Sequence, residues 1–236
     1  MKKLILLSFL ITTSCVEISK KEAAKPKFGL VIHGGAGTIL RKNMTLEKEE
    51  KYRAVLAEAI QVGHRILKGG GSSQEAVEKT INIMEDSPLF NAGKGAVLNS
   101  NASIELDASF MEGKSLGAGA ISGVRTVKNP ISAAIKVMEA SPHVMLSGSG
   151  ADTFASEQGL EIVSPEYFLT ERRINALREV QKASSTSNTN DKHQSNDFIN
   201  QQRYGTVGCV ALDMFGNLAA GTSTGGMTNK KWNRIG

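Results

Sequence analysis

The sequence contains little cysteine, because Cys15 and Cys209 are the only two among its 236 residues. Two cysteines exclude a disulfide-rich secreted scaffold and a zinc site built from cysteine ligands. Aromatic residues are also scarce, at 5%, but 40% of the chain is apolar and 22% is charged. That balance is typical of a globular protein rather than a disordered one. A chain of this length buries roughly 70% of its unfolded surface, so it needs neither a metal nor disulfides to form a core.

Apolar runs long enough to span a membrane are absent after Cys15. Residues 1–14 join two lysines to an apolar run at 4–11 and to small residues, which predicts a signal peptide rather than a buried helix. Cys15 stands where bacterial lipoproteins carry their lipidated cysteine, although Thr12 replaces the usual leucine or valine. We therefore expect export to the bacterial periplasm or cell envelope, with either a lipid anchor on Cys15 or simple cleavage.

A strong charge of one sign is absent from most of the chain. The formal net charge is +5, but residues 1–27 hold six lysines and two glutamates, which leaves 22 basic and 21 acidic residues elsewhere. A nearly neutral body argues against a nucleic-acid partner, which would need a basic surface. The polar, lysine-rich stretch at 15–27 predicts a tether between the signal peptide and the folded part.

The rest of the chain shows helical and strand periods in turn. Residues 45–68 keep apolar side chains at a spacing of about 3.6 residues, which predicts a helix that the glycines at 69–71 end. Ser72 and Glu75 form a capping box that opens a second helix. The expected strands lie at 28–32, 104–111, 116–127, 207–212 and 218–224, and the expected helices lie at 45–68, 72–84, 130–140 and after 164–166.

Two common catalytic patterns are missing. No G-x-S-x-G elbow surrounds any serine, and the four histidines lie in no triad context, so serine-hydrolase chemistry is excluded. The glycine turn at 34–37 follows the first strand but matches neither phosphate-binding pattern of nucleotide sites. A nucleotide-binding protein with a glycine loop remains an alternative. His33, directly before this turn, is more often a structural histidine than a catalytic one.

Thr206 stands at the border between a polar linker and a strand. Residues 183–204 are rich in Ser, Asn and Gln, which predicts a flexible linker, and Gly205 lets the backbone before Thr206 adopt a strained geometry. Such a site suits self-cleavage, in which the Thr206 hydroxyl attacks the Gly205 carbonyl and hydrolysis frees an N-terminal threonine. Its α-amine, with an ordinary pKa of about 7.7 to 8.0, then serves as base for its own hydroxyl. Taken alone, a glycine and a threonine that enter a strand are the simpler interpretation.

Six short motifs occur together in one order and favour the catalytic interpretation. They are HGGAG at 33–37, NAGKG at 91–95, LDAS at 106–109, SPHVM at 141–145, GTVG at 205–208 and TSTGGMTNK at 222–230. With them, residues 28–236 resemble the plant-type asparaginase and isoaspartyl peptidase family of N-terminal nucleophile (Ntn) hydrolases. Glycosylasparaginases share the fold and the nucleophile but lack the first motif, so they are the nearer alternative.

The resemblance implies an α+β fold, a four-layer αββα sandwich of the Ntn-hydrolase type. Residues 28–205 would form the first subunit of the cleaved enzyme, and residues 206–236 would begin the second. The family pattern continues after Gly236 with an aspartate and a Thr-Gly pair that bind substrate. The resemblance therefore implies a fold that is incomplete at the C-terminus and a fragment that is inactive alone. For the full-length enzyme it implies a dimer of cleaved protomers.

The resemblance also implies roles for single residues. Thr206 would be the nucleophile and, after cleavage, the base; Thr224 would hydrogen-bond it, and Asn91 would lie near it. Arg234 would hold the substrate α-carboxylate, a role that suits a guanidinium fork. The turn at 33–37 would lie beside the nucleophile. No cofactor for catalysis is implied, but a structural sodium ion is, held by main-chain carbonyls of a loop with Met84, Glu85, Ser87, Phe90, Ala92 and Lys94.

The implied reaction is hydrolysis of a β-aspartyl amide bond, in free asparagine or in an isoaspartyl dipeptide. The threonine would form a β-aspartyl ester, ammonia or an amino acid would leave, and water would release aspartate. In such acyl transfer, donors aimed at the developing oxyanion usually supply the largest stabilisation. A non-catalytic lipoprotein that keeps the fold as a binding module is the remaining alternative.

Overall fold

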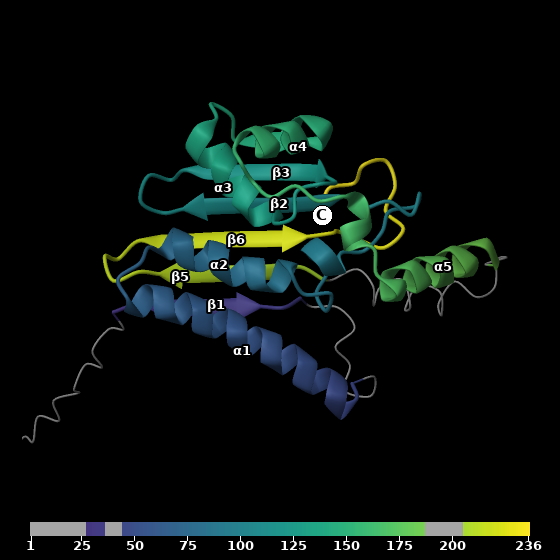
Figure 1. Cartoon of the computed structure of the whole chain (residues 1–236), viewed down its shortest axis with the longest axis horizontal. Coiled ribbons are helices and arrows are strands. Elements are labelled where there is room, and N and C mark those ends of the chain that lie inside the picture. The colour runs from purple at the N-terminus through teal and green to yellow at the C-terminus, as the bar shows by residue number, and fades with distance from the viewer. Residues whose placement is uncertain (1–26, 36–43, 187–204) are drawn as a thin grey trace, which may run out of the picture.

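A computed structural model describes residues 27–35, 44–186 and 205–236. These residues form a six-stranded sheet with the strand order β1-β5-β6-β2-β3-β4 (Figure 1). Neighbouring strands are antiparallel except for β3 and β4, which are parallel. The strands are β1 (Gly29–His33), β2 (Leu106–Glu112), β3 (Ala118–Val124), β4 (Met145–Ser147), β5 (Val207–Leu212) and β6 (Leu218–Thr224).

The helices begin where the sequence supplies capping groups. The Thr45 hydroxyl accepts from Lys48 N at 3.2 Å, and the Ser72 hydroxyl accepts from Glu75 N at 3.1 Å, so the N-cap expected at Ser72 is confirmed. The α-helices are α1 (Leu46–Lys68), α2 (Ser73–Glu85), α3 (Pro130–Ala140), α4 (Gly148–Glu157) and α5 (Glu171–Thr186), and two 3-10 turns are η2 (Gly93–Gly95) and η3 (Pro165–Phe168).

One face of the sheet carries the helices. Figure 1 shows α2 across β5 and β6 and α3 across β2 and β3, and α1 packs against α2 and β1. Gly221 in β6 lies where α2 and α3 meet, because a Cβ there would come within 2.9 Å of both Val77 and Ile131. Cys209 in β5 is buried on this side, and burial raises the pKa of its thiol to about 12. It is therefore a packing residue rather than a nucleophile.

The opposite face of the sheet is exposed among the described residues. One row across the strands joins Val31, Val210, Ala220 and Met111, which face one another in register. Their side chains are largely apolar, yet Val31 is 70% exposed and Val210 and Met111 are each 47% exposed. We call these four residues the open face. A sheet face of this composition is normally covered by another layer.

The structure differs from the sequence-based expectations in three places. It adds β4 and α4, which no periodic pattern indicated, and it shortens the strand expected at 116–127 to Ala118–Val124. The helix expected after 164–166 begins as η3, and α5 itself starts only at Glu171. α5 then continues to Thr186, four residues into the stretch expected to be a linker. Within the described ranges, no helix has the length and apolarity to cross a membrane.

Candidate active site

Gly205 and Thr206 lie directly before β5, at the end of the sheet where β5 begins and β6 ends. β5 and β6 form an antiparallel hairpin in which Val207 is opposite Ser223. The residue before β5 therefore comes beside Thr224, the last residue of β6. Two segments that the sequence marked separately, the GTVG motif and the end of the second hairpin strand, meet because of this register.

Three hydrogen bonds converge on the Thr224 hydroxyl. It accepts from Thr206 Oγ1 at 3.1 Å and from Gly226 N at 3.0 Å, and it donates to the Gly205 carbonyl oxygen at 3.1 Å. One donor and two acceptor positions are the full capacity of a hydroxyl. The directions are therefore fixed: the Thr206 proton points to Thr224, and the Thr224 proton points to the carbonyl of the bond between Gly205 and Thr206.

Asn91 lies in the loop between α2 and β2 and is 5% exposed. Its Nδ2 donates to the Gly226 carbonyl at 2.8 Å, and its Oδ1 accepts from Val97 N at 2.9 Å. Its own carbonyl accepts from Gly225 N at 3.2 Å. A Cβ on Gly205 would lie only 2.7 Å from Asn91 Cβ, so glycine is needed for this approach. Asn91 thus contacts Gly205 and holds the turn that follows Thr224.

The glycine turn after β1 also reaches the bond between Gly205 and Thr206. Gly35 has a φ of 106°, in the left-handed region that favours glycine. A Cβ on Gly35 would lie 3.2 Å from Gly205 Cα and 3.3 Å from Thr206 N. The backbone of this turn therefore packs against the peptide group that Thr206 would attack.

A buried cluster of charges lies beside Thr224. Lys230 is 2% exposed, and its Nζ lies 3.7 Å from Glu105 Oε2 and 3.6 Å from Asp107 Oδ2. Asp107 is directly opposite Thr224 in the β2–β6 register. Arg125 adds a second cation, 3.1 Å from Glu105 Oε1. Because removal of one partner would leave an uncompensated buried charge, this cluster holds the sheet edge in one arrangement.

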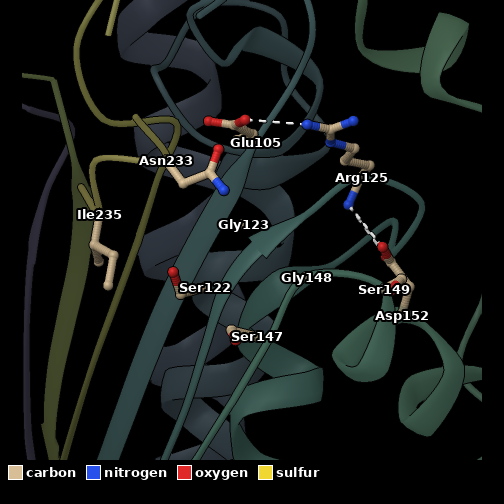
Figure 2. A pocket seen from close by; sticks show the side chains of 10 residues that line it. All are labelled: Glu105, Ser122, Gly123, Arg125, Ser147, Gly148, Ser149, Asp152, Asn233 and Ile235. Atoms are coloured by element: carbon tan, nitrogen blue, oxygen red, sulfur yellow. Dashed lines mark hydrogen bonds and ion pairs between the residues drawn. The ribbon is translucent and has the colours of Figure 1, made fainter. Parts of the chain in front are cut away.

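A cavity of about 440 Å³ adjoins the charge cluster. Figure 2 shows its walls, which consist of Glu105, Ser122, Gly123, Arg125, Ser147, Gly148, Ser149, Asp152, Asn233 and Ile235. The Arg125 side chain donates to Glu105, and its backbone N donates to Asp152 at 3.1 Å. Arg125 therefore links the two carboxylates that line the cavity. The cavity lies at the C-terminal ends of β3 and β4. These strand ends are at the same end of the sheet as Thr224.

The loop from Met84 to Lys94, expected to bind sodium, is tightly wound. Gly93 has a φ of 49°, and a Cβ on it would collide with the Glu85 carbonyl. A Cβ on Gly95 would collide with the Phe90 carbonyl oxygen and lie 2.7 Å from that of Pro88. Main-chain carbonyls therefore crowd around two glycines. Two of the expected ligands already accept N–H bonds, because Ala92 O accepts from Gly95 N at 3.1 Å and Met84 O from Ser87 N at 3.4 Å.

The Glu85 side chain points from this loop toward α3. Its Oε1 accepts from Ile131 N at 2.9 Å and its Oε2 accepts from Asn129 Nδ2 at 3.2 Å. Burial raises the pKa of this carboxyl to about 8. The side chain therefore joins the loop to the N-terminus of α3, whereas a sodium ligand would come from its main-chain carbonyl.

For other residues singled out by sequence, the described contacts do not involve Thr206. Arg234 is exposed in the last segment, where its backbone N donates to Lys231 O at 3.1 Å, and no hydrogen bond or ion pair of the described residues joins its guanidinium to Thr206. The His33 ring packs over Gly208, a structural contact. Cys15 and residues 36–37 lie outside the described residues.

Two buried cations near the site carry no role in the sequence-based reading. Lys230 was noted only as the end of a motif, and Arg173 was not noted at all. Arg173 is 8% exposed and shares one face of α5 with Leu177 and Val180, at positions i, i+4 and i+7. An arginine in an otherwise apolar helix stripe is the signal that could have identified it.

In the part of the chain that the structure describes, no group of three or more His, Cys, Asp or Glu side chains is arranged to hold a metal ion. The groups that the structure brings together around Thr206 are hydroxyl, amide and backbone groups. Thr206, Thr224, Asn91 and Gly205 are together, and they can order a hydroxyl beside a polarised backbone carbonyl.

A family model described as asparaginase matches residues 25–236. The chain is 46% identical over 207 residues to the isoaspartyl peptidase of Escherichia coli (strain K12). The matched region covers 88% of this chain and 64% of that protein. It is 43% identical to the isoaspartyl peptidase/L-asparaginase of Mus musculus, over 88% of this chain and 60% of the relative, and 42% identical to that of Xenopus laevis, over 88% and 62%. The chain thus spans less than two thirds of the length of these relatives.

Proposed function

We propose, from the premise that this chain belongs to the asparaginase family, that the protein hydrolyses β-aspartyl amide bonds in isoaspartyl peptides or L-asparagine. One observation carries the proposal: the hydrogen bonds from Thr206 to Thr224 and from Thr224 to the Gly205 carbonyl. They put a hydroxyl nucleophile beside a backbone carbonyl whose oxygen already has a donor. The relatives named as isoaspartyl peptidases support the same class of substrate.

Self-cleavage begins with Thr206 Oγ1 and the carbonyl carbon of Gly205. The Oγ1–C bond forms, the C–N bond breaks, and the hydroxyl proton ends on the released α-amine, so an amide becomes an ester. The Thr224 hydroxyl, 3.1 Å from the carbonyl oxygen, stabilises the negative charge that develops there. Water then hydrolyses the ester, which leaves a carboxylate on Gly205 and makes Thr206 an N-terminal residue.

Turnover uses the same threonine a second time. The freed α-amine of Thr206, with an ordinary pKa of about 7.7 to 8.0, takes the proton of its own hydroxyl. The hydroxyl oxygen attacks the β-carbonyl of the substrate, ammonia or an amino acid leaves with the proton, and water releases aspartate. The Thr224 hydroxyl, free of the Gly205 carbonyl after cleavage, continues to orient the nucleophile.

In the proposed substrate complex, Arg234 binds the α-carboxylate of the aspartyl group. A guanidinium fork matches a carboxylate with two parallel hydrogen bonds, and the exposed position of Arg234 leaves its donors available. Small molecules and dipeptides are the partners that this arrangement suits.

A second sheet covers the open face in the four-layer αββα sandwich that we propose. The support is the apolar character of Val31, Met111 and Val210, which are 47–70% exposed in the described part. Helices cover the other face, so a second sheet here, covered in turn by helices of its own, would produce the order helix, sheet, sheet, helix.

A structural sodium ion on the loop from Met84 to Lys94 also belongs to the proposal. Carbonyl oxygens suit a hard cation, and those of Glu85, Pro88 and Phe90 crowd around Gly93 and Gly95. The ion would brace the loop that carries Asn91. It would take no part in the transfer of the acyl group.

The proposal also keeps the expected processing and assembly. Residues 1–14 direct export to the periplasm or cell envelope, residues 15–27 tether the body, and Cys15 is the lipidation site; the sequence pattern alone supports this. Cleavage divides residues 28–205 from residues 206–236, and the cleaved protomers pair into a dimer. The names of the relatives do not favour a glycosylasparaginase or a non-catalytic lipoprotein.

The function is tested by incubating the protein, expressed from its own reading frame, with a β-aspartyl dipeptide and separately with L-asparagine. We expect release of the leaving amino acid or of ammonia. The matched control is Thr206→Ala, which keeps Thr224 and Asn91 but lacks the nucleophile. Equal product release by this variant and by the wild-type protein would contradict the proposal.

A further inference from the structure

Two consecutive arginines at the start of α5 donate to the loop that carries Asn91. Arg173 Nε donates to the Gly95 carbonyl at 2.6 Å, and Arg172 Nη1 donates to the Leu89 carbonyl at 3.3 Å. Leu89 precedes Asn91 by two residues and Gly95 follows it by four. The first turn of α5 therefore holds this loop on both sides of its asparagine.

The burial of Arg173 indicates that this side chain is there to bind the Gly95 carbonyl. The side chain is 8% exposed, and no carboxylate of the described residues lies within ion-pair distance of it. Burial, assisted by the neighbouring charge of Arg172, lowers the pKa of its guanidinium to about 9. A buried cation without a carboxylate is unfavourable, so packing alone would be served better by an apolar residue at this position.

The contacts continue from the loop to the scissile bond. Asn91 Oδ1 accepts from Val97 N, two residues after Gly95, and Asn91 Nδ2 donates to the Gly226 carbonyl. Gly226 N in turn donates to the Thr224 hydroxyl. A shift of Gly95 would therefore move the groups that orient the proton of Thr206.

We propose that Arg173, assisted by Arg172, is a positioning residue that fixes Asn91 and thereby aligns Thr224 for self-cleavage and turnover. This inference rests on the proposed function of Thr206. α5 is also the last described helix before Gly205, so the same contact ties the segment that leads to the scissile bond onto the loop beside it.

The test compares five variants with the wild-type protein expressed from its own reading frame, and one of them, Arg173→Ala, removes the whole side chain. Arg173→Gln removes the charged donor, Arg173→Lys keeps the charge but not the fork, and Arg172→Gln removes the exposed partner, whose loss leaves the core intact. The matched control is Arg178→Gln, because Arg178 is exposed on the same helix and its Nη1 donates to Asn175 within that helix.

We expect Arg173→Gln to slow cleavage before Thr206 on the order of 100-fold and to lower kcat more than it raises KM, because displaced groups remote from the chemistry have effects of this size. Arg173→Lys and Arg172→Gln should slow cleavage about tenfold or less, and Arg178→Gln should match the wild type. For Arg173→Ala, millimolar guanidinium chloride should restore part of the rate, whereas the same concentration of sodium chloride should not. Unchanged rates in Arg173→Gln and in Arg173→Ala would overturn the proposal.

A second measurement separates this inference from the proposed function. Hydrogen exchange is followed over residues 88–97 in a Thr206→Ala background, with and without Arg173→Gln. We expect faster exchange in that segment only when Arg173 is replaced, even if no chain is ever cleaved. Equal exchange would overturn the positioning role, whereas a wild-type protein that never cleaves would overturn only the proposed function.

Discussion

At the scale of single residues, the Thr224 hydroxyl is the group on which the site depends. It uses all three of its hydrogen-bonding positions, on Thr206, Gly205 and Gly226.

Thr224→Val keeps the shape of the side chain but removes the hydroxyl that donates to the Gly205 carbonyl. We expect self-cleavage to slow on the order of 100-fold or more, the usual effect of losing one oxyanion donor, as measured by the cleaved fraction over time on a denaturing gel. Thr222→Val is the control, since Thr222 is exposed on the same strand and contacts Ser109 instead; similar slowing in both variants would contradict this role.

Gly205 provides a second test at this scale. A Cβ at position 205 would lie 2.7 Å from Asn91 Cβ, so Gly205→Ala should force the scissile carbonyl away from Thr224 and slow cleavage at least tenfold. The control is Gly29→Ala, because no atom lies within 4 Å of a Cβ at Gly29. Intact-mass measurement of the uncut fraction distinguishes the two variants, and normal cleavage in Gly205→Ala would show that Asn91 and Gly205 are not in this contact.

At the scale of elements, the β5–β6 hairpin brings Thr206 to Thr224, and its turn depends on Asp213. The buried Asp213 carboxylate accepts from Phe215 N and Asn217 N at 2.9 Å each and from Ser73 N at 3.2 Å. Burial acts to raise the pKa of this carboxyl, but the N–H donors, above all Asn217, outweigh it and hold the pKa below its ordinary value. The turn is thus tied both to itself and to the start of α2.

Replacement of Asp213 therefore has a pH signature. A carboxyl whose folded pKa is lowered stabilises the fold above its unfolded pKa of about 3.9, and that stabilisation is lost as pH falls through the folded pKa. We expect Asp213→Asn to lower the free energy of unfolding by about 1–3 kcal/mol at neutral pH and by much less near about pH 3. Urea titrations at the two pH values measure the difference. Glu58→Gln, at an exposed helix position, should change neither value; a pH-independent loss in Asp213→Asn would contradict the assignment.

The elements that could be predicted from sequence are those with their own local pattern. The long period of α1, the capping group Ser72 and the apolar strand at 207–212 each indicate an element without help from the rest of the chain. β4 and α4 could not be predicted because the glycine- and serine-rich stretch at 147–150, where β4 ends and α4 begins, has no apolar period, and the place of β4 depends on its pairing with β3.

The site divides in the same way. Thr206, Thr224 and Asn91 belong to motifs in the sequence, and the hairpin register accounts for the meeting of the first two. The contact between Arg173 and Gly95 could not be predicted, because it joins residues 78 positions apart through a loop that no period describes. Arg234 shows the converse, since the family resemblance identifies it but the described contacts do not bring it to Thr206.

At the scale of the whole molecule, a charged substitution on the open face tests whether another layer covers this sheet. In the protein expressed from its own reading frame, Val210→Lys would then bury an unpaired charge and should lower Tm by several degrees, which corresponds to about 2 kcal/mol or more. Leu46→Lys is the control, because Leu46 is 82% exposed at the first position of α1. Thermal unfolding of the two variants gives the comparison, and equal Tm values would contradict a covering layer.

The proposed cleavage before Thr206 would not separate the described residues into two bodies. β5 and β6 follow the scissile bond in sequence, yet they lie between β1 and β2 in the sheet. The Lys230 cluster adds buried ion pairs to Glu105 and Asp107 across the same division. The two products of cleavage should therefore remain associated under native conditions and separate only in denaturant.

The measurement that tests this account most directly is intact-mass analysis, with N-terminal sequencing, of the purified protein expressed from its own reading frame. The account predicts two polypeptides that co-purify, the second of which begins at Thr206, and a single uncut polypeptide for Thr206→Ala. One uncut chain in the wild-type protein, or a cut at any other bond, would contradict the assignment of Thr206 as the nucleophile.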